Sequence, residues 1–164
     1  MVALGLCTGL GAQETRPLSG QWATLTIEPQ LRRNHIEIIF GTLRLDPVTK
    51  PLEYWIERRE RRGSAETMAW ADSRRCSPLH PLIAAMRDLE PLRPDPPGFN
   101  DDAALSLAVD GTLYRLEGSG RTGDRQSGRF SMSTNVGTPL AAWADRLEAE
   151  LKPCWSSSRP TSKG

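Results

Sequence analysis

Alternating apolar and polar positions predict four consecutive strands in the first half of the chain. In residues 21–28 the side chains of Ala23, Leu25 and Ile27 share one face, which is the period of a half-buried strand. Comparable patterns, bounded by turn residues, predict strands over residues 35–45, 52–59 and 65–72. Because strands joined by short turns pair antiparallel, we expect these four to form a continuous antiparallel sheet.

Two segments carry the period of an amphipathic helix. The first begins at Ser77-Pro78 and the second at Thr138-Pro139, and each ends at a proline. In both, a hydroxyl residue that can cap the helix precedes a proline whose fixed φ suits the first turn. Apolar residues recur on one face of each helix, namely Leu79, Leu82, Ile83, Met86 and Leu89 in the first and Leu140, Trp143, Ala144, Leu147 and Leu151 in the second. We therefore expect both helices to pack against the sheet.

Further strands are predicted between the two helices. Residues 103–109 and 112–117 flank Asp110-Gly111, a strong signal for a two-residue hairpin. The glycine-rich segment 118–128 is interpreted as a flexible loop, and residues 129–134 return as a strand.

Together these elements predict a single α+β domain over residues 13–155, with an antiparallel sheet of about seven strands and two helices on one face. The two strand-strand-helix halves resemble each other, so a duplicated unit is one interpretation and a chance match of common turn and cap residues is another. The last residues, 156–164, are polar and have nothing to bury, so a disordered tail is expected.

The chain contains three cysteines, Cys7, Cys76 and Cys154. Residues 1–12 are apolar and small and resemble the end of a secretory signal peptide, although the positively charged segment that normally precedes one is missing. Removal of Cys7 with the signal would leave an even count. We therefore expect a disulfide between Cys76 and Cys154 in a periplasmic or secreted protein. That bond would bring the start of the first helix beside the end of the second.

Two other interpretations of the cysteines remain open. Cys76 and Cys154 could be free buried thiols of a cytosolic protein, and Cys7 could carry a lipid, although the bulky Leu6 before it disfavours the lipid anchor. No apolar run approaches the roughly 18 residues that a membrane-spanning helix needs, so no membrane span is expected.

Charge changes this picture only locally. The formal net charge of +1 supplies no global field that would recruit nucleic acid or an anionic membrane. One predicted hairpin, however, carries Arg58, Arg59, Arg61 and Arg62, which could bind a protein or an anionic envelope component. The alternative is a solvated hairpin tip that protects a sheet edge from pairing.

Tryptophans are numerous, and two of them are candidates for the same binding surface. Trp22 and Trp55 fall opposite the apolar faces of their strands, where they could form an exposed aromatic surface. The alternative is core or cross-strand packing.

Catalytic and metal-binding patterns are weak. His35 and His80 are the only histidines; a Cys76–His80 nucleophile pair would require Cys76 to be reduced. Asp95, Asp101 and Asp102 lack the spacing of a calcium loop, and no serine-nucleophile or phosphate-loop motif is present. We expect no metal and no cofactor.

These observations favour a non-enzymatic exported protein that binds a protein or an envelope component. One alternative is a small hydrolase or transferase that uses His35, His80 or unrecognised carboxylates, and a concave pocket with a histidine beside a carboxylate would favour it. Another alternative is a structural envelope protein.

Overall fold

The structure is a computed structural model. It describes residue 18 and residues 20–30, 34–43, 52–89, 111–121 and 126–161. The predicted signal segment 1–12, the strand 103–109 and the hairpin turn at Asp110 lie outside the described residues.

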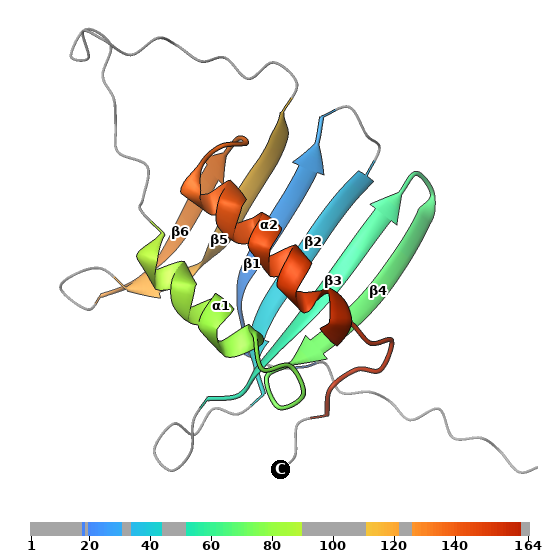
Figure 1. The fold of residues 1–164 in the computed structure, drawn as a ribbon. Coiled ribbons are helices and arrows are strands. Elements are labelled where there is room, and N and C mark those ends of the chain that lie inside the picture. The colour runs from blue at the N-terminus through green and yellow to red at the C-terminus, as the bar shows by residue number, and fades with distance from the viewer. Residues whose placement is uncertain are drawn as a thin grey trace, which may run out of the picture.

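Six strands form one antiparallel sheet (Figure 1). They are β1 (Gln21–Pro29), β2 (Asn34–Thr42), β3 (Tyr54–Arg62), β4 (Ala65–Asp72), β5 (Thr112–Arg121) and β6 (Ser127–Thr134). Their order is β4-β3-β2-β1-β5-β6, so β4 and β6 are the edge strands of the described sheet. The α+β class and the antiparallel sheet are confirmed, with six described strands where about seven were predicted. Each half of the chain supplies a hairpin followed by a helix, at opposite edges of the sheet.

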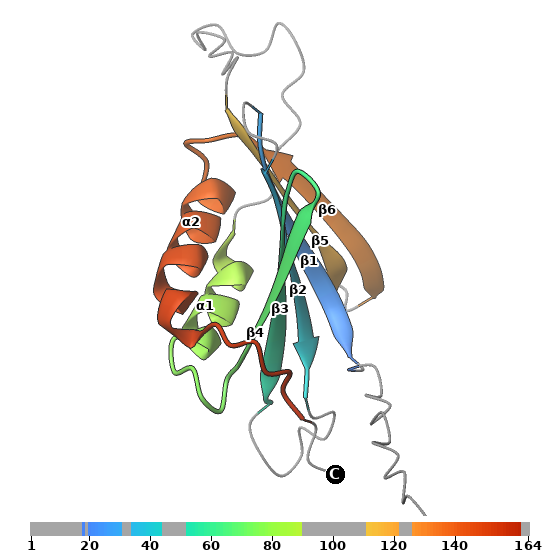
Figure 2. The ribbon, with the colours of Figure 1, turned by 90° about the vertical axis from the view of Figure 1, so that its right-hand side faces the viewer.

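Two helices cover the same face of the sheet (Figure 2). They are α1 (Leu79–Ala85), continued by the 3-10 turn η1 (Met86–Asp88), and α2 (Pro139–Leu151), continued by η2 (Lys152–Cys154). Thr138 caps α2 as predicted, because its hydroxyl accepts a hydrogen bond from the Ala141 N–H at 3.3 Å. Ser77 does not cap α1; that helix begins after Pro78 without a side-chain cap. None of the helices in the described residues is long and apolar enough to cross a membrane.

The main core lies between the helices and the sheet. Its fully buried side chains come from four strands and both helices, namely Leu25, Ile38, Phe40, Ile56, Leu116, Leu79, Leu82, Leu140, Leu147 and Leu151. The indole N–H of Trp143 on α2 donates to the Leu82 carbonyl of α1 at 2.9 Å inside this core. A buried polar bond of this kind fixes how the two helices lie against each other.

The disulfide between Cys76 and Cys154 is confirmed. The Cα atoms of the two residues are 5.6 Å apart, within the usual range for a disulfide. Since Cys76 precedes α1 and Cys154 ends η2, the bond joins the start of one helix to the end of the other.

The two described ends of the segment predicted as a flexible glycine-rich loop are strand. Residues 118–121 of β5 pair with residues 127–130 of β6. Close packing explains the glycine at position 118, because a Cβ atom there would lie 2.6 Å from the Trp22 carbonyl oxygen. The glycine therefore permits close approach of β1. The prediction of a loop was wrong for residues 118–121 and 127–128, and residues 122–125 lie outside the described residues.

The described part of the C-terminal tail packs against β4. Ser156 and Trp70 exchange two backbone hydrogen bonds, of 2.7 and 2.9 Å. The Arg159 guanidinium lies 5.2 Å from the centre of a Trp70 ring, and Arg74 donates to the Thr161 carbonyl at 2.9 Å. We expected a disordered tail; its residues up to Thr161 instead find an aromatic ring and an available strand edge.

Candidate functional site

The side of the sheet that faces away from the helices, here called the outer face, is mostly polar. Because side chains alternate along a strand, the residues between the core positions point to this side. They include Thr24, Thr26 and Glu28 on β1, His35 and Glu37 on β2, Glu57, Arg59 and Arg61 on β3, and Arg115 and Glu117 on β5. A smaller apolar cluster of Ile39, Leu43, Trp55 and Trp70, with Leu18 against it, occupies one end of the outer face.

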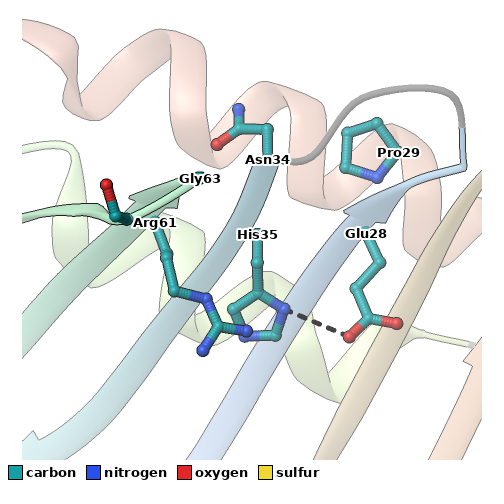
Figure 3. A pocket seen from close by; sticks show the side chains of 7 residues that line it. Glu28, Pro29, Asn34, His35, Arg61 and Gly63 are labelled. Carbon is teal, nitrogen blue, oxygen red and sulfur yellow. Dashed lines mark hydrogen bonds and ion pairs between the residues drawn. The ribbon is translucent and has the colours of Figure 1, made fainter.

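The other end of the outer face contains an open hollow (Figure 3). Glu28 near the end of β1, His35 near the start of β2 and Arg61 near the end of β3 meet there. The antiparallel ladder places His35 directly opposite Arg61. Its remaining lining residues are Pro29, Asn34, Gly63 and Ser64. We call this group of residues the hollow.

A histidine–carboxylate pair forms one wall of the hollow. The Nδ1 atom of His35 lies 3.1 Å from the Oε1 atom of Glu28. Because an ionised carboxylate only accepts hydrogen bonds, Nδ1 carries the proton, and the Nε2 atom of neutral His35 is left as an acceptor. The two side chains are 34% and 44% exposed, so this pair is solvated.

Arg61 supplies a positive charge that the described residues do not neutralise by an ion pair. Its side chain is exposed and lies beside the His35 ring in Figure 3. The neighbouring Arg59 differs, because it pairs with Glu57 and lies 3.5 Å from Glu37. The Oδ1 atom of Asn34, also in the hollow, is buried and accepts no hydrogen bond from described residues. The hollow thus offers one cation, one imidazole and one carboxylate to a ligand, while the Asn34 oxygen is buried at its wall.

The four arginines of β3 do not form a single patch. Alternation turns Arg58 and Arg62 toward the helix side and Arg59 and Arg61 toward the outer face. Arg58 binds Glu148 of α2, with its Nε atom 3.0 Å from both carboxylate oxygens, and its Nη1 atom lies 2.8 Å from Glu60. Burial acts to lower the pKa of Arg58, but the hydrogen bonds to Glu148 and Glu60 outweigh it and raise that pKa. Arg58 therefore holds α2 to β3, and the predicted four-arginine surface is corrected to its outer-face half.

Neither candidate tryptophan forms an exposed aromatic surface. Trp55 is on the outer face but only 3% exposed, because it packs against Trp70 in the apolar cluster. Trp22 is half-buried and lies against Phe40, with ring centres 5.8 Å apart. An irregularity in the β1–β2 register between Gln21 and Ala23 accounts for its packing with the main core.

The two histidines are not brought together. His80 packs edge-on against Tyr54, at the end of the β2–β3 ladder opposite to His35. Cys76 is bonded to Cys154, which removes the thiolate that a Cys76–His80 nucleophile pair would need.

The described residues do not form a metal-binding site. No group of three or more histidine, cysteine, aspartate or glutamate side chains is arranged to hold a metal ion there. The earlier candidates Asp95, Asp101 and Asp102 lie outside the described residues.

Sequence reasoning did not single out Glu28. Glu28 and His35 sit near the two ends of the turn between β1 and β2, so the hairpin brings them face to face. Predicting the pairing register of the β1–β2 hairpin would have placed Glu28 beside His35.

Comparison with known proteins gives no match. No protein-family model, no curated protein and no solved structure matches this chain. Function is therefore inferred from the chemistry of the outer face.

Proposed function

We propose that this protein is an exported, non-enzymatic binding protein that recognises an anionic group of a protein or envelope component at the hollow. The observation that carries the proposal is Arg61, an exposed guanidinium that has no ion-pair partner among the described residues. Guanidinium groups bind carboxylate and phosphate oxygens through two parallel hydrogen bonds. On the same strand, Arg58, Arg59 and Arg62 already bind carboxylates of the protein itself.

His35 supports an anion at the same place. When protonated, its Nε2 atom becomes a second donor beside Arg61, and Glu28 keeps the ring oriented through Nδ1. The Glu28 carboxylate opposes a bound anion, so we expect modest affinity and a ligand that contacts Arg61 first.

Two further observations support export. A disulfide that links the two helices favours an oxidising compartment, and residues 1–12 resemble part of a secretory signal. An exported protein would meet anionic groups of envelope polymers, lipids and proteins.

The test is an NMR titration with three defined anions: inorganic phosphate, succinate and a capped tetraglutamate peptide. We expect saturable shifts of the Arg61 and His35 signals with at least one of them. Arg61→Glu should abolish these shifts. The matched control is Arg75→Glu, which makes the same charge change at an exposed site beyond the opposite end of β4. Unsaturable shifts with all three anions, or equal binding by Arg61→Glu and the wild type, would contradict the proposal.

A second candidate function is a small hydrolase or transferase. The observation in its favour is the Glu28–His35 pair in a hollow, since an imidazole oriented through Nδ1 can act as a general base through Nε2. Two observations weigh against it: the pair is solvated, and no described hydroxyl or thiol is hydrogen-bonded to the His35 ring. Turnover of chromogenic esters or phosphate esters that His35→Gln abolishes and Arg61→Glu only weakens would favour the enzyme over the binding protein.

A further inference from the structure

The outer edge of β4 has backbone groups that the described residues satisfy only in part. Both the N–H and the C=O of Trp70 point outward, because both bond to Ser156. Backbone orientation alternates along a strand, so the N–H and C=O groups of Met68 and Glu66 point the same way. The segment that contains Ser156 is thus an observed example of a strand pairing with this edge.

That segment leaves the edge after one residue pair. The Ser158 N–H donates to the Ser156 hydroxyl at 3.0 Å, and Arg159 then crosses over Trp70. Met68 and Glu66 receive no partner at their outward groups from any part of the chain that the structure describes. Residues 65–68 are all exposed, and Met68 is 49% exposed.

Apart from the charges of Glu66 and Asp72 and the contact with Ser156, β4 lacks the features that usually protect an edge strand. Its sequence, AETMAWAD, contains no proline and no lysine, and its register with β3 runs without a bulge from Ala65 to Asp72. A regular, exposed edge of this kind is a template for an added strand.

We propose that an extended segment of a partner protein adds to the sheet alongside Met68 and Glu66. On the outer face its side chains would lie beside these two residues, so the matching segment has an apolar residue and a cation two positions apart. Glu66 is exposed and forms no ion pair within 4 Å among the described residues. Arg61 lies opposite it in the β3–β4 ladder and Arg59 interacts with it electrostatically, so the cation of the added segment would share this carboxylate with them. The argument for this edge does not rest on the proposed function. Because Glu66 lies opposite Arg61, the Met68 variants, which change neither charge, distinguish failure at the edge from failure at the hollow.

A second copy of the chain fits this edge less well. Two β4 strands related by a two-fold axis pair antiparallel. The register that centres on Glu66 places two carboxylates directly opposite each other, which is unfavourable. Registers shifted toward Met68 place the second copy against Trp70, whose edge Ser156 already occupies.

The test uses two capped peptides, Thr-Val-Thr-Lys-Thr-Val-Thr and the same peptide with Glu in place of Lys. The peptide has a valine two positions before the lysine and another two positions after it. Whether the peptide pairs parallel or antiparallel to β4, Lys can therefore lie beside Glu66 and a Val beside Met68. We expect the wild-type protein to bind the Lys peptide roughly threefold more tightly than the Glu peptide, as for one cross-strand charge pair. Hydrogen exchange at the Met68 and Glu66 amides should slow when the Lys peptide binds.

Two variants make the test specific. Glu66→Lys should reverse the preference between the two peptides. Met68→Pro removes an outward N–H, a change that an edge strand tolerates, and should abolish peptide binding. Met68→Ala keeps that N–H and should retain peptide binding. Failure of both peptides to bind, equal binding by Met68→Pro, or self-association of the wild type that Met68→Pro abolishes would overturn the proposal.

Discussion

Glu60 is the carboxylate on which two arginines of β3 converge. It is buried on the helix side of the sheet, between Arg58 and Arg62. Burial acts to raise the pKa of Glu60, but the hydrogen bonds from Arg58 and Arg62 outweigh it, and the net pKa is lowered. Arg58 also binds Glu148, so the charge of Glu60 contributes to the link between β3 and α2.

A pH-dependent contribution to stability follows from this lowered pKa. A carboxylate whose pKa is lower in the folded state stabilises the protein above the unfolded-state pKa, about 4.3 for glutamate, and this contribution is lost as the pH falls through the folded-state value. We expect Glu60→Gln to lower the free energy of unfolding at pH 7 by about 1 to 2 kcal/mol, and the difference from wild type to shrink below about pH 4. Urea unfolding at several pH values measures this. A difference that stays constant from pH 7 to pH 3 would contradict it, and Glu66→Gln on exposed β4 is the control.

At the scale of single residues, the sequence shows which arginines are near each other but not which way they point. Trp55 and Ile56 are adjacent apolar residues, and both are buried, on opposite sides of β3. An alternating pattern with both faces apolar has no unique phase, so the faces of Arg58 and Arg61 could not be assigned from it. The pairing of β3 with β2 and β4 decides on which face each arginine lies.

At the scale of elements, the N-terminus of α2 depends on one side chain. The Thr138 hydroxyl accepts from the Ala141 N–H and donates within the preceding turn, where it lies 3.0 Å from the Asn135 carbonyl. We expect Thr138→Ala to reduce the free energy of unfolding by about 1 kcal/mol, as for other helix caps. Thr138→Ser keeps the hydroxyl and is the control. Chemical denaturation measures both variants, and an equal loss in Thr138→Ser would assign the effect to the methyl group instead.

Element positions were predictable where a period and a boundary residue coincide. The strand periods located β1, β2, β3 and β4, and Thr138-Pro139 located α2. The position of β5 beside β1 was not predictable in this way, because that pairing joins residues about 90 positions apart and leaves no local pattern. The same limit applies to the hollow, whose residues come from three strands.

At the scale of the whole molecule, residue type singled out arginines and histidines as candidates but could not predict how they are arranged. Arg61 and His35 were singled out from residue type alone, but their proximity depends on the register of β2 with β3. Glu28 was missed because nothing in the polar end of β1 distinguishes it until the hairpin closes.

The disulfide contributes to the stability of the molecule as a whole. Cys76 and Cys154 are 78 positions apart, so the bond restricts a large part of the unfolded chain. On the chain-entropy model, reduction should lower the free energy of unfolding by about 4 kcal/mol and the Tm by about 10 °C. The native sheet should remain, because the bond acts chiefly on the unfolded state. Thermal unfolding of the double variant Cys76→Ala/Cys154→Ala, in a chain without Cys7, measures the loss. The reduced parent chain should match the variant, and an unchanged Tm in both would show that the two helices hold the sheet without the covalent link.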